Sequence, residues 1–165
     1  NKPYGLHRPR ENKYFESPKL ICKGMFLSPE FCYDEEKYYV GFSFSVIIEK
    51  DHNYSLKYLL GVLNSNLGRY WFNNNGKKRG VGVDIGVLVF RQFPVYKATY
   101  EQQKQIDNMV EKMLTLNRTL FVSSGDEGNK RKLQAEIEQV DYAINQKIYE
   151  IYELDRNEIE IVENA

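Results

Sequence analysis

Three segments in the first hundred residues have the hydrophobic pattern of strands. Residues 18–23 form a short apolar run between a proline and a glycine, as is typical of a short strand. Residues 38–49 alternate aromatic or branched residues with small polar ones, which is the period of two expected for a half-buried strand. Residues 83–95 are again rich in branched and aromatic residues, up to a proline near their end. The pattern therefore predicts three strands in this part of the chain.

A helical period separates the second and third of these segments. Apolar residues recur three and four positions apart over residues 56–71, which places them on one face of a single helix. Ser55 can cap the start of this helix. The Asn-Asn-Asn-Gly run at 73–76 can end it, because asparagine and glycine tolerate left-handed backbone.

The last third of the chain is predicted to be helical. Apolar residues recur at the same helical intervals over residues 106–120 and 133–151, and the polar residues 123–129 between them are typical of a loop. Two helices of about 20 residues joined by a short loop predict an antiparallel hairpin with a coiled-coil-like seam. Asp155 can cap a final short helix, with Glu158 at the capping-box position.

The predicted fold class is α+β: a mixed, mainly antiparallel sheet with one packed amphipathic helix, followed by a C-terminal antiparallel helical hairpin. Charge divides at the same point as periodicity. Residues 1–100 carry 15 Lys and Arg against 9 Asp and Glu, and residues 101–165 carry 8 against 14, so net charges of +6 and −6 cancel in a chain of zero formal charge. We expect a basic, strand-rich region at 1–100, which also holds 19 of the 23 aromatic residues. Residues 101–165 should form an acidic helical hairpin with a short final helix, packed on that region or on a partner domain.

Composition excludes several classes of protein. No run approaches the roughly 20 apolar residues of a membrane-spanning helix, and the first residues lack the apolar core of a signal peptide. The cysteines Cys22 and Cys32 have no histidine or cysteine at metal-ligand spacing, so we expect two reduced thiols in a cytoplasmic protein, with a disulfide between them as the alternative. His7 and His52 are far apart in the sequence. No metal site, cofactor-binding motif or general acid–base pair is identifiable, and the chain is expected to be non-catalytic.

The densest cluster of positive charge lies in residues 73–82. Three adjacent cations between asparagines and glycines predict a mobile loop at a helix end. Such a loop can follow a phosphate backbone, where each cation displaces condensed counterions, and asparagine side chains have the geometry to read adenine edges. A solvated surface loop is the alternative. The candidate DNA-binding residues are Lys77, Lys78 and Arg79 for phosphates, with Arg69, Arg8, Arg10 and Lys23 in support, and Asn73, Asn74 and Asn75 for base edges.

Several short motifs occur in an order that is typical of one family. In chain order they are PKLI at 18–21, YYV at 38–40, LLGVLNS at 59–65, FPV at 93–95, a Gln-Gln pair at 102–103, IYEIYEL at 148–154 and EIEIV at 158–162. Together they resemble the TaqI-like C-terminal specificity domain of adenine-specific DNA methyltransferases, as found in type IIG and related restriction–modification proteins. The resemblance covers nearly the whole chain, and the leucine-rich LLGVLNS and the IYEIYEL segment are its most specific parts.

The resemblance implies a prokaryotic target-recognition domain that binds double-stranded DNA and reads a short sequence. A separate domain would flip and methylate adenine with S-adenosylmethionine, so no cofactor is expected in this chain. That methyltransferase domain would lie N-terminal to this chain, which begins with Asn rather than Met. It would be a partner of this domain, together with other restriction–modification subunits. The rival hypothesis is a protein–protein interaction module that uses the helical hairpin and has no direct role at DNA.

Overall fold

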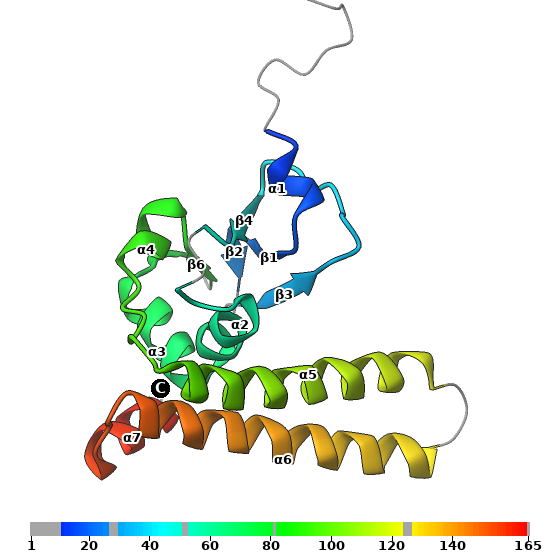
Figure 1. The fold of residues 1–165 in the computed structure, drawn as a ribbon. Helices are drawn as coiled ribbons and strands as arrows, with labels where there is room; N and C mark the ends of the chain where they lie inside the picture. Colours follow the sequence, from blue (N-terminus) through cyan, green and yellow to red (C-terminus); the bar gives the residue numbers. More distant parts are fainter. Residues whose placement is uncertain (1–10, 27–29, 51–52, 81, 124–126, 165) are drawn as a thin grey trace, which may run out of the picture.

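The chain folds into three layers, which lie one above another in Figure 1. This computed structural model describes residues 11–26, 30–50, 53–80, 82–123 and 127–164. Two small sheets form one outer layer, helices α2 (Leu56–Asn64) and α3 (Asn66–Asn75) the middle layer, and helices α5 (Tyr100–Val122) and α6 (Glu127–Ile151) the other outer layer. The shorter helices of the described part are α1 (Lys13–Glu16), α4 (Val87–Gln92) and α7 (Arg156–Glu163). Its strands are β1 (Lys19–Lys23), β2 (Met25–Phe26), β3 (Phe31–Asp34), β4 (Phe44–Ile48), β5 (Lys77–Arg79) and β6 (Gly82–Asp84). The predicted α+β class is confirmed.

The two sheets are linked by one continuous stretch of chain. β1 lies between β3 and β4 in the first sheet, β6 lies between β2 and β5 in the second, and every neighbouring pair is antiparallel. β1 passes into β2 through Gly24. The N–H of Gly24 donates to the carbonyl of Ser43, beside the first sheet, and its carbonyl accepts from the N–H of Ile85, beside the second, both at 2.9 Å. Gly24 therefore fixes the position of one sheet relative to the other.

The strand predictions are right in part. β1 confirms the strand predicted at 18–23. The strand predicted over 38–49 is wrong in its first half, because pairing with β1 begins only at Phe44. β3 is a further strand that the period of two did not reveal, since its four residues are too few to establish an alternation.

A buried ion pair connects β1 with β3. The ammonium group of Lys19 contacts the carboxylate of Asp34, and both side chains are almost completely buried. Lys19 also donates to the carbonyl of Phe15 at 2.8 Å. The Asp34 carboxylate in turn accepts from the backbone N–H groups of Glu36 and Tyr38 at 2.9 and 3.0 Å, so the chain turns directly after β3. The pair thus aligns two strands and shapes the loop that follows them.

The single amphipathic helix that the periodicity predicts is divided into α2 and α3. The break is at Ser65, which has extended backbone (φ −64°, ψ 164°) and caps α3 by accepting from the N–H of Gly68 at 3.1 Å. The Ser65 hydroxyl also donates to the carbonyl of Val62 at 2.7 Å. The N–H of Asn66 donates to the side chain of Asn145 on α6 at 2.7 Å. The apolar period continues through the break, so the sequence pattern does not show it.

The strand predicted over 83–95 is wrong beyond its first two residues. Pairing with β5 ends at Asp84, and α4 begins three residues later, after Gly86 in extended backbone. A short apolar run fits a strand or a buried helical turn equally well, and here the hydrogen bonds from Val89 and Phe90 to the Gly86 carbonyl form the helix.

The predicted helical hairpin is confirmed, but α6 begins at Glu127, so residues 127–129 of the loop predicted at 123–129 belong to the helix. α5 begins with a capping box made by Thr99 and Gln102, and α6 packs antiparallel along α5. α7 begins at the predicted cap, where Asp155 and Glu158 form a second capping box. No helix in the described ranges is long and apolar enough to cross a membrane.

α5 packs closely against α2 at a glycine. A Cβ atom at Gly61 would lie 2.8 Å from Ile106 Cγ2 and 3.2 Å from Val110 Cγ2, which is closer than side chains tolerate. The absence of a side chain therefore lets the two helices approach. The hydrophobic core continues across this contact, from Leu20 in β1 through α2 to Ile144 in α6.

Candidate nucleic-acid interface

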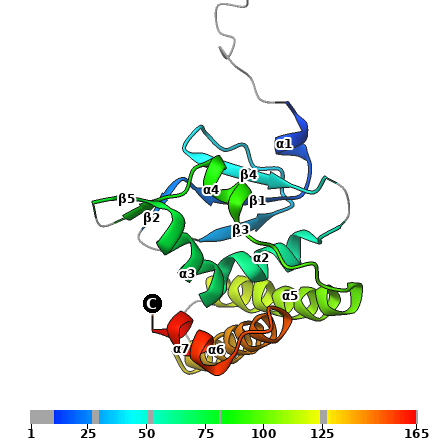
Figure 2. The same ribbon diagram turned by 90° about the vertical axis from the view of Figure 1, so that its left-hand side faces the viewer.

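The three adjacent cations lie on an exposed edge strand. Among the strands of the described residues, β5 pairs with β6 alone, and Lys77, Lys78 and Arg79 are all exposed. Figure 2 shows β5 and β2 at one side of the molecule, away from α5 and α6. Side chains alternate along a strand, so Lys77 and Arg79 lie on one face of the sheet and Lys78 lies on the other. Both faces of this edge therefore carry positive charge.

A carboxylate lies between the cations on one face. Asp84 is opposite Lys77 in the β5–β6 register, and its Oδ2 lies 2.9 Å from Nε of Arg79. Both side chains of this ion pair remain partly exposed, at 56% for Arg79 and 32% for Asp84. Because the pair is exposed, a competing anion can reach Arg79 at a modest cost in free energy.

The sequence predicts a mobile loop at these cations, and this is wrong, because they form a strand that is followed by a turn. Lys78 pairs with Val83 and Arg79 with Gly82, and Gly80 turns the chain with φ +60°, a conformation that glycine adopts without strain. Three successive cations have little intrinsic preference for a strand, but on an edge strand they stay in water. The glycines at 80 and 82 between two short runs were the sequence signal for this hairpin.

The asparagine run lies in the last turn of α3 rather than in a loop. The side-chain amides of Asn74 and Asn75 donate to the carbonyls of Tyr70 and Trp71, at 2.8 and 2.9 Å. Asn73 is half-buried, whereas the other two are exposed. The run directly precedes β5, so it borders the cationic edge, and the side chains of Asn74 and Asn75 satisfy carbonyls of their own helix.

The supporting cations are spread over different parts of the molecule. Lys23 is exposed at the end of β1, next to the junction that leads into β2. Arg69 lies in the first turn of α3, where its charge acts on Asp141 of α6, so the structure does not bring it to β5. Arg8 and Arg10 lie outside the described residues.

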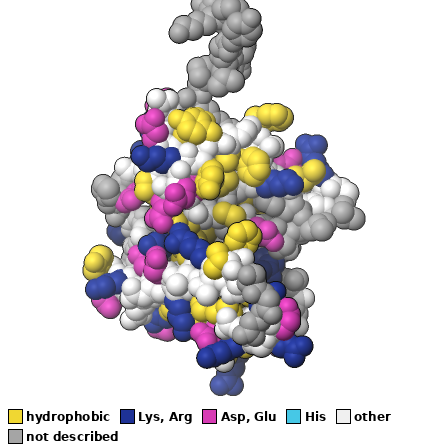
Figure 3. Space-filling model, turned by 90° about the vertical axis from the view of Figure 1, so that its right-hand side faces the viewer, with side chains coloured by type: hydrophobic (Ala, Val, Ile, Leu, Met, Phe, Trp, Pro, Cys, Tyr) yellow, Lys and Arg dark blue, Asp and Glu magenta, His cyan; other side chains and the backbone are white. Residues whose placement is uncertain are grey.

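Exposed aromatic residues lie in the loop between β3 and β4. Tyr38, Tyr39 and Phe42 are 65%, 69% and 96% exposed, and the Tyr39 ring stacks on Phe15 at 4.4 Å between centroids. Figure 3 shows hydrophobic side chains gathered over the upper part of this face, where the sheets lie. The strand prediction assigned these residues to a sheet. Aromatic side chains on a surface can stack on bases or sugars, which makes this loop a further candidate contact.

The acidity of the helical hairpin is concentrated at one end. Near the tip, exposed or half-buried cations predominate, and Figure 3, which looks onto the tip, shows Lys and Arg side chains around its lower end. These cations are Arg118, Lys130, Arg131 and Lys132. Two of them have carboxylate partners, since Arg118 pairs with Glu35 at 3.2 Å and Lys130 with Glu127 at 3.2 Å. The net charge of −6 over residues 101–165 therefore comes mainly from the part near α7 and not from the tip.

Comparison with known proteins identifies one family. The sequence model of the TaqI-like C-terminal specificity domain matches residues 2–95, which include both sheets, α2, α3 and α4. No curated protein matches the chain. Among the described residues, no group of three or more His, Cys, Asp or Glu side chains could hold a metal ion.

Proposed function

Since the chain belongs to the family of TaqI-like C-terminal specificity domains, we propose that it is the DNA target-recognition domain of an adenine-specific DNA methyltransferase in a restriction–modification system. In this proposal the chain is non-catalytic and directs the enzyme to its target sequence. Catalysis and S-adenosylmethionine binding belong to a methyltransferase domain N-terminal to it.

The observation that carries the proposal is the cationic edge strand β5. It projects at the side of the sheet layer, its three side chains are exposed, and the exposed end of β1 adds Lys23. β5 is an edge strand, so its three cations can approach a DNA backbone without displacing another strand. We propose that Lys77, Lys78 and Arg79 contact phosphates, and that Asn73, Asn74 and Asn75 beside them approach base edges.

The test is the salt dependence of DNA binding by the chain with Lys77, Lys78 and Arg79 all replaced by Ala. Each lost phosphate contact reduces the slope of log K against log salt by about 0.9, so the triple variant should lose about 2 to 3 in slope. Asp84→Asn should instead strengthen DNA binding, because it frees Arg79 and removes a negative charge from the same face. Fluorescence anisotropy with a labelled duplex over a range of salt concentrations measures both.

The matched control is a triple variant that changes the net charge of the chain by the same amount, at a site on α6 rather than on β5. Replacing Lys130, Arg131 and Lys132 with Ala removes three adjacent cations from the start of α6. This variant should retain most of the slope if β5 is the contact. An equal loss in both triple variants, or an unchanged slope in the β5 variant, would remove β5 from the interface.

A further inference from the structure

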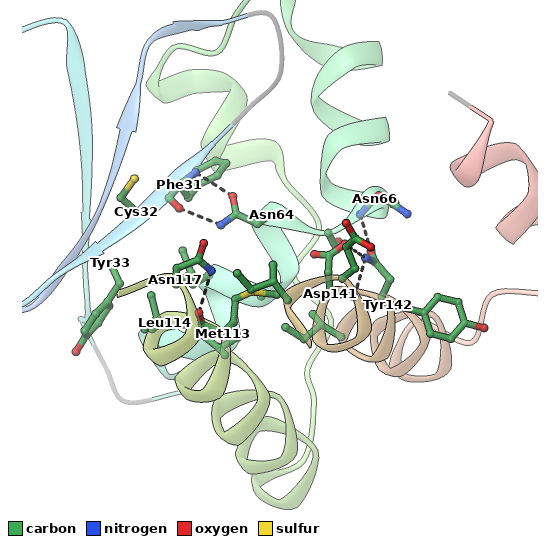
Figure 4. A pocket seen from close by; sticks show the side chains of 18 of the residues that line it. Phe31, Cys32, Tyr33, Asn64, Asn66, Met113, Leu114, Asn117, Asp141 and Tyr142 are labelled. Atoms are coloured by element: carbon green, nitrogen blue, oxygen red, sulfur yellow. Dashed lines mark hydrogen bonds between the residues drawn. The ribbon is translucent and has the colours of Figure 1, made fainter. Parts of the chain in front are cut away.

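A groove lies where the sheet layer meets the helical hairpin. It has a volume of about 720 Å³ and is lined by residues of β3, α2, α3, α5, α6 and α7. Figure 4 shows it between Phe31 and Tyr33 on one side and Asp141 and Tyr142 on the other. Its volume is within the range of sites that bind small ligands or the side chains of a bound peptide. The groove is separate from the cationic edge β5.

The floor of the groove is apolar. Its members come from the facing sides of three helices and are Leu60, Gly61, Val110, Met113, Leu114, Ile137 and Ile144. Met113 and Leu114 on α5 and Ile137 on α6 are only partly buried, although they pack against the core. An apolar side chain that entered the groove would remove this surface from water, which is favourable.

Among the described residues that line the groove, the charged ones are Glu138, Asp141 and Glu163, and all three are acidic. Burial raises the pKa of the Asp141 carboxyl, and the charge of Arg69 lowers it. A carboxylate that has lost part of its hydration gains more from a cationic partner than a fully hydrated one does. Phosphate groups, by contrast, would be repelled here.

Polar groups around the margin can orient an occupant. Tyr142 is 65% exposed and combines an apolar ring with a hydroxyl group. Asn117 is also exposed, and one of its amide hydrogens is already donated to the carbonyl of Met113 at 2.9 Å. Asn64 has a structural role instead, because its amide both donates to and accepts from the backbone of Phe31, at 2.9 Å in each case.

From this combination we infer that the groove is a docking site for a polypeptide segment of a partner protein, in which an apolar anchor residue is flanked by Lys or Arg. The apolar floor receives the anchor, and the three carboxylates receive the cations. The surface for DNA and the surface for a protein partner then lie on different parts of the chain and differ in the sign of their charge. The site does not depend on β5 binding DNA.

The probe is a set of acetylated and amidated pentapeptides added to the isotopically labelled chain. Arg-Leu-Lys-Leu-Arg should shift the amide resonances of the groove residues in a saturable way, with a Kd below about 1 mM. Arg-Ser-Lys-Ser-Arg and Glu-Leu-Glu-Leu-Glu should bind at least about fivefold more weakly, since each lacks one of the two features that the groove recognises. Equal binding of the serine peptide, or shifts that map elsewhere on the chain, would overturn the proposal.

Variants distinguish binding of the peptide in the groove from its general attraction to acidic residues. Glu138→Gln with Asp141→Asn should raise the Kd of the leucine peptide about fivefold, while Glu101→Gln with Glu160→Gln, at exposed carboxylates outside the lining, should leave it within about twofold. Asn117→Trp should block the groove, and amide dispersion verifies that each variant is folded. If the chain self-associates in sedimentation and Asn117→Trp abolishes this, the occupant is a second copy and the proposal of a basic partner segment is overturned.

Discussion

At the scale of single residues, the two cysteines lie on neighbouring strands in very different surroundings. Cys22 points into the core and is 1% exposed, and burial raises its pKa to about 12. Cys32 on β3 is exposed and lines the groove, and partial burial together with the charge of Glu30 raises its pKa as well. Only thiolates react with alkylating reagents, so accessibility and pKa both protect Cys22.

We expect iodoacetamide at pH 8 to modify Cys32 in the folded chain at least about 100-fold faster than Cys22. Raising the pH should accelerate the reaction of each thiol only while its thiolate fraction still increases, which for Cys22 continues to about pH 12. Mass spectrometry of peptides after timed labelling measures both rates, and labelling in urea is the control in which the difference should disappear. Equal rates in the folded chain would show that Cys22 is not held in the core.

The sequence could indicate which residues carry the positive charge of the candidate interface, but not how they are arranged. The charge of Lys77, Lys78 and Arg79 and their exposure follow from their chemistry. The Asp84 partner depends on the register of a hairpin whose strands are only three residues long, and no local pattern specifies that register. The sequence groups Arg69 with these cations on charge alone, whereas Arg69 lies in the first turn of α3 and β5 follows the last turn.

At the scale of elements, the long helices α5 and α6 were predictable because their apolar period continues over many residues. The division between α2 and α3 was not, since the apolar period continues through Ser65 and one of the hydrogen bonds at the break joins Asn66 to Asn145, 79 positions away in the sequence. Short strands and short helices are hard to predict for the same reason. A brief apolar run fits either, and contacts with residues far along the chain decide whether it forms a strand or a helix.

Gly68 is the residue that makes the break between α2 and α3 possible. A Cβ atom there would lie 2.5 Å from the carbonyl oxygen of Val62 and 2.6 Å from that of Leu63. Both are backbone atoms, so they cannot move aside without disturbing α2. We expect Gly68→Ala to lower the free energy of unfolding by about 1–3 kcal/mol, measured by urea denaturation. Gly41→Ala is the control, with no atom within 4 Å of its Cβ position and an expected change within about 0.5 kcal/mol. A similar small change for Gly68→Ala would contradict the close contact.

At the scale of the whole molecule, the strand-rich region and the helical hairpin share one hydrophobic core. Ile106 and Val110 of α5 cover α2, and Ile144 of α6 belongs to the same cluster as Leu20 of β1. The division of charge and periodicity near residue 100 is therefore not a division of the core. A boundary in composition does not by itself reveal where buried surfaces meet.

We expect a chain truncated after Ala98 to lose cooperative thermal unfolding, because α2 would expose the face that α5 covers. Truncation after Leu154 removes only α7, of which Val162 is the buried residue, and should keep a single sharp transition. Circular dichroism during heating distinguishes the two. A sharp transition in the shorter chain at nearly the original temperature would mean that residues 1–98 fold alone.

The close contact at Gly61 also has a mechanical consequence. Beyond Val110 the arm of α5 extends twelve residues to Val122, or about 18 Å at the rise of an α-helix. Because Gly61 has no side chain, α5 packs directly on α2, and farther along α5 Arg118 pairs with Glu35 of the loop after β3 at 3.2 Å. The helical hairpin is thus attached to the rest of the chain at two places along α5. We expect a partner that binds the tip of the helical hairpin to move the sheets, and β5 with them, as one body.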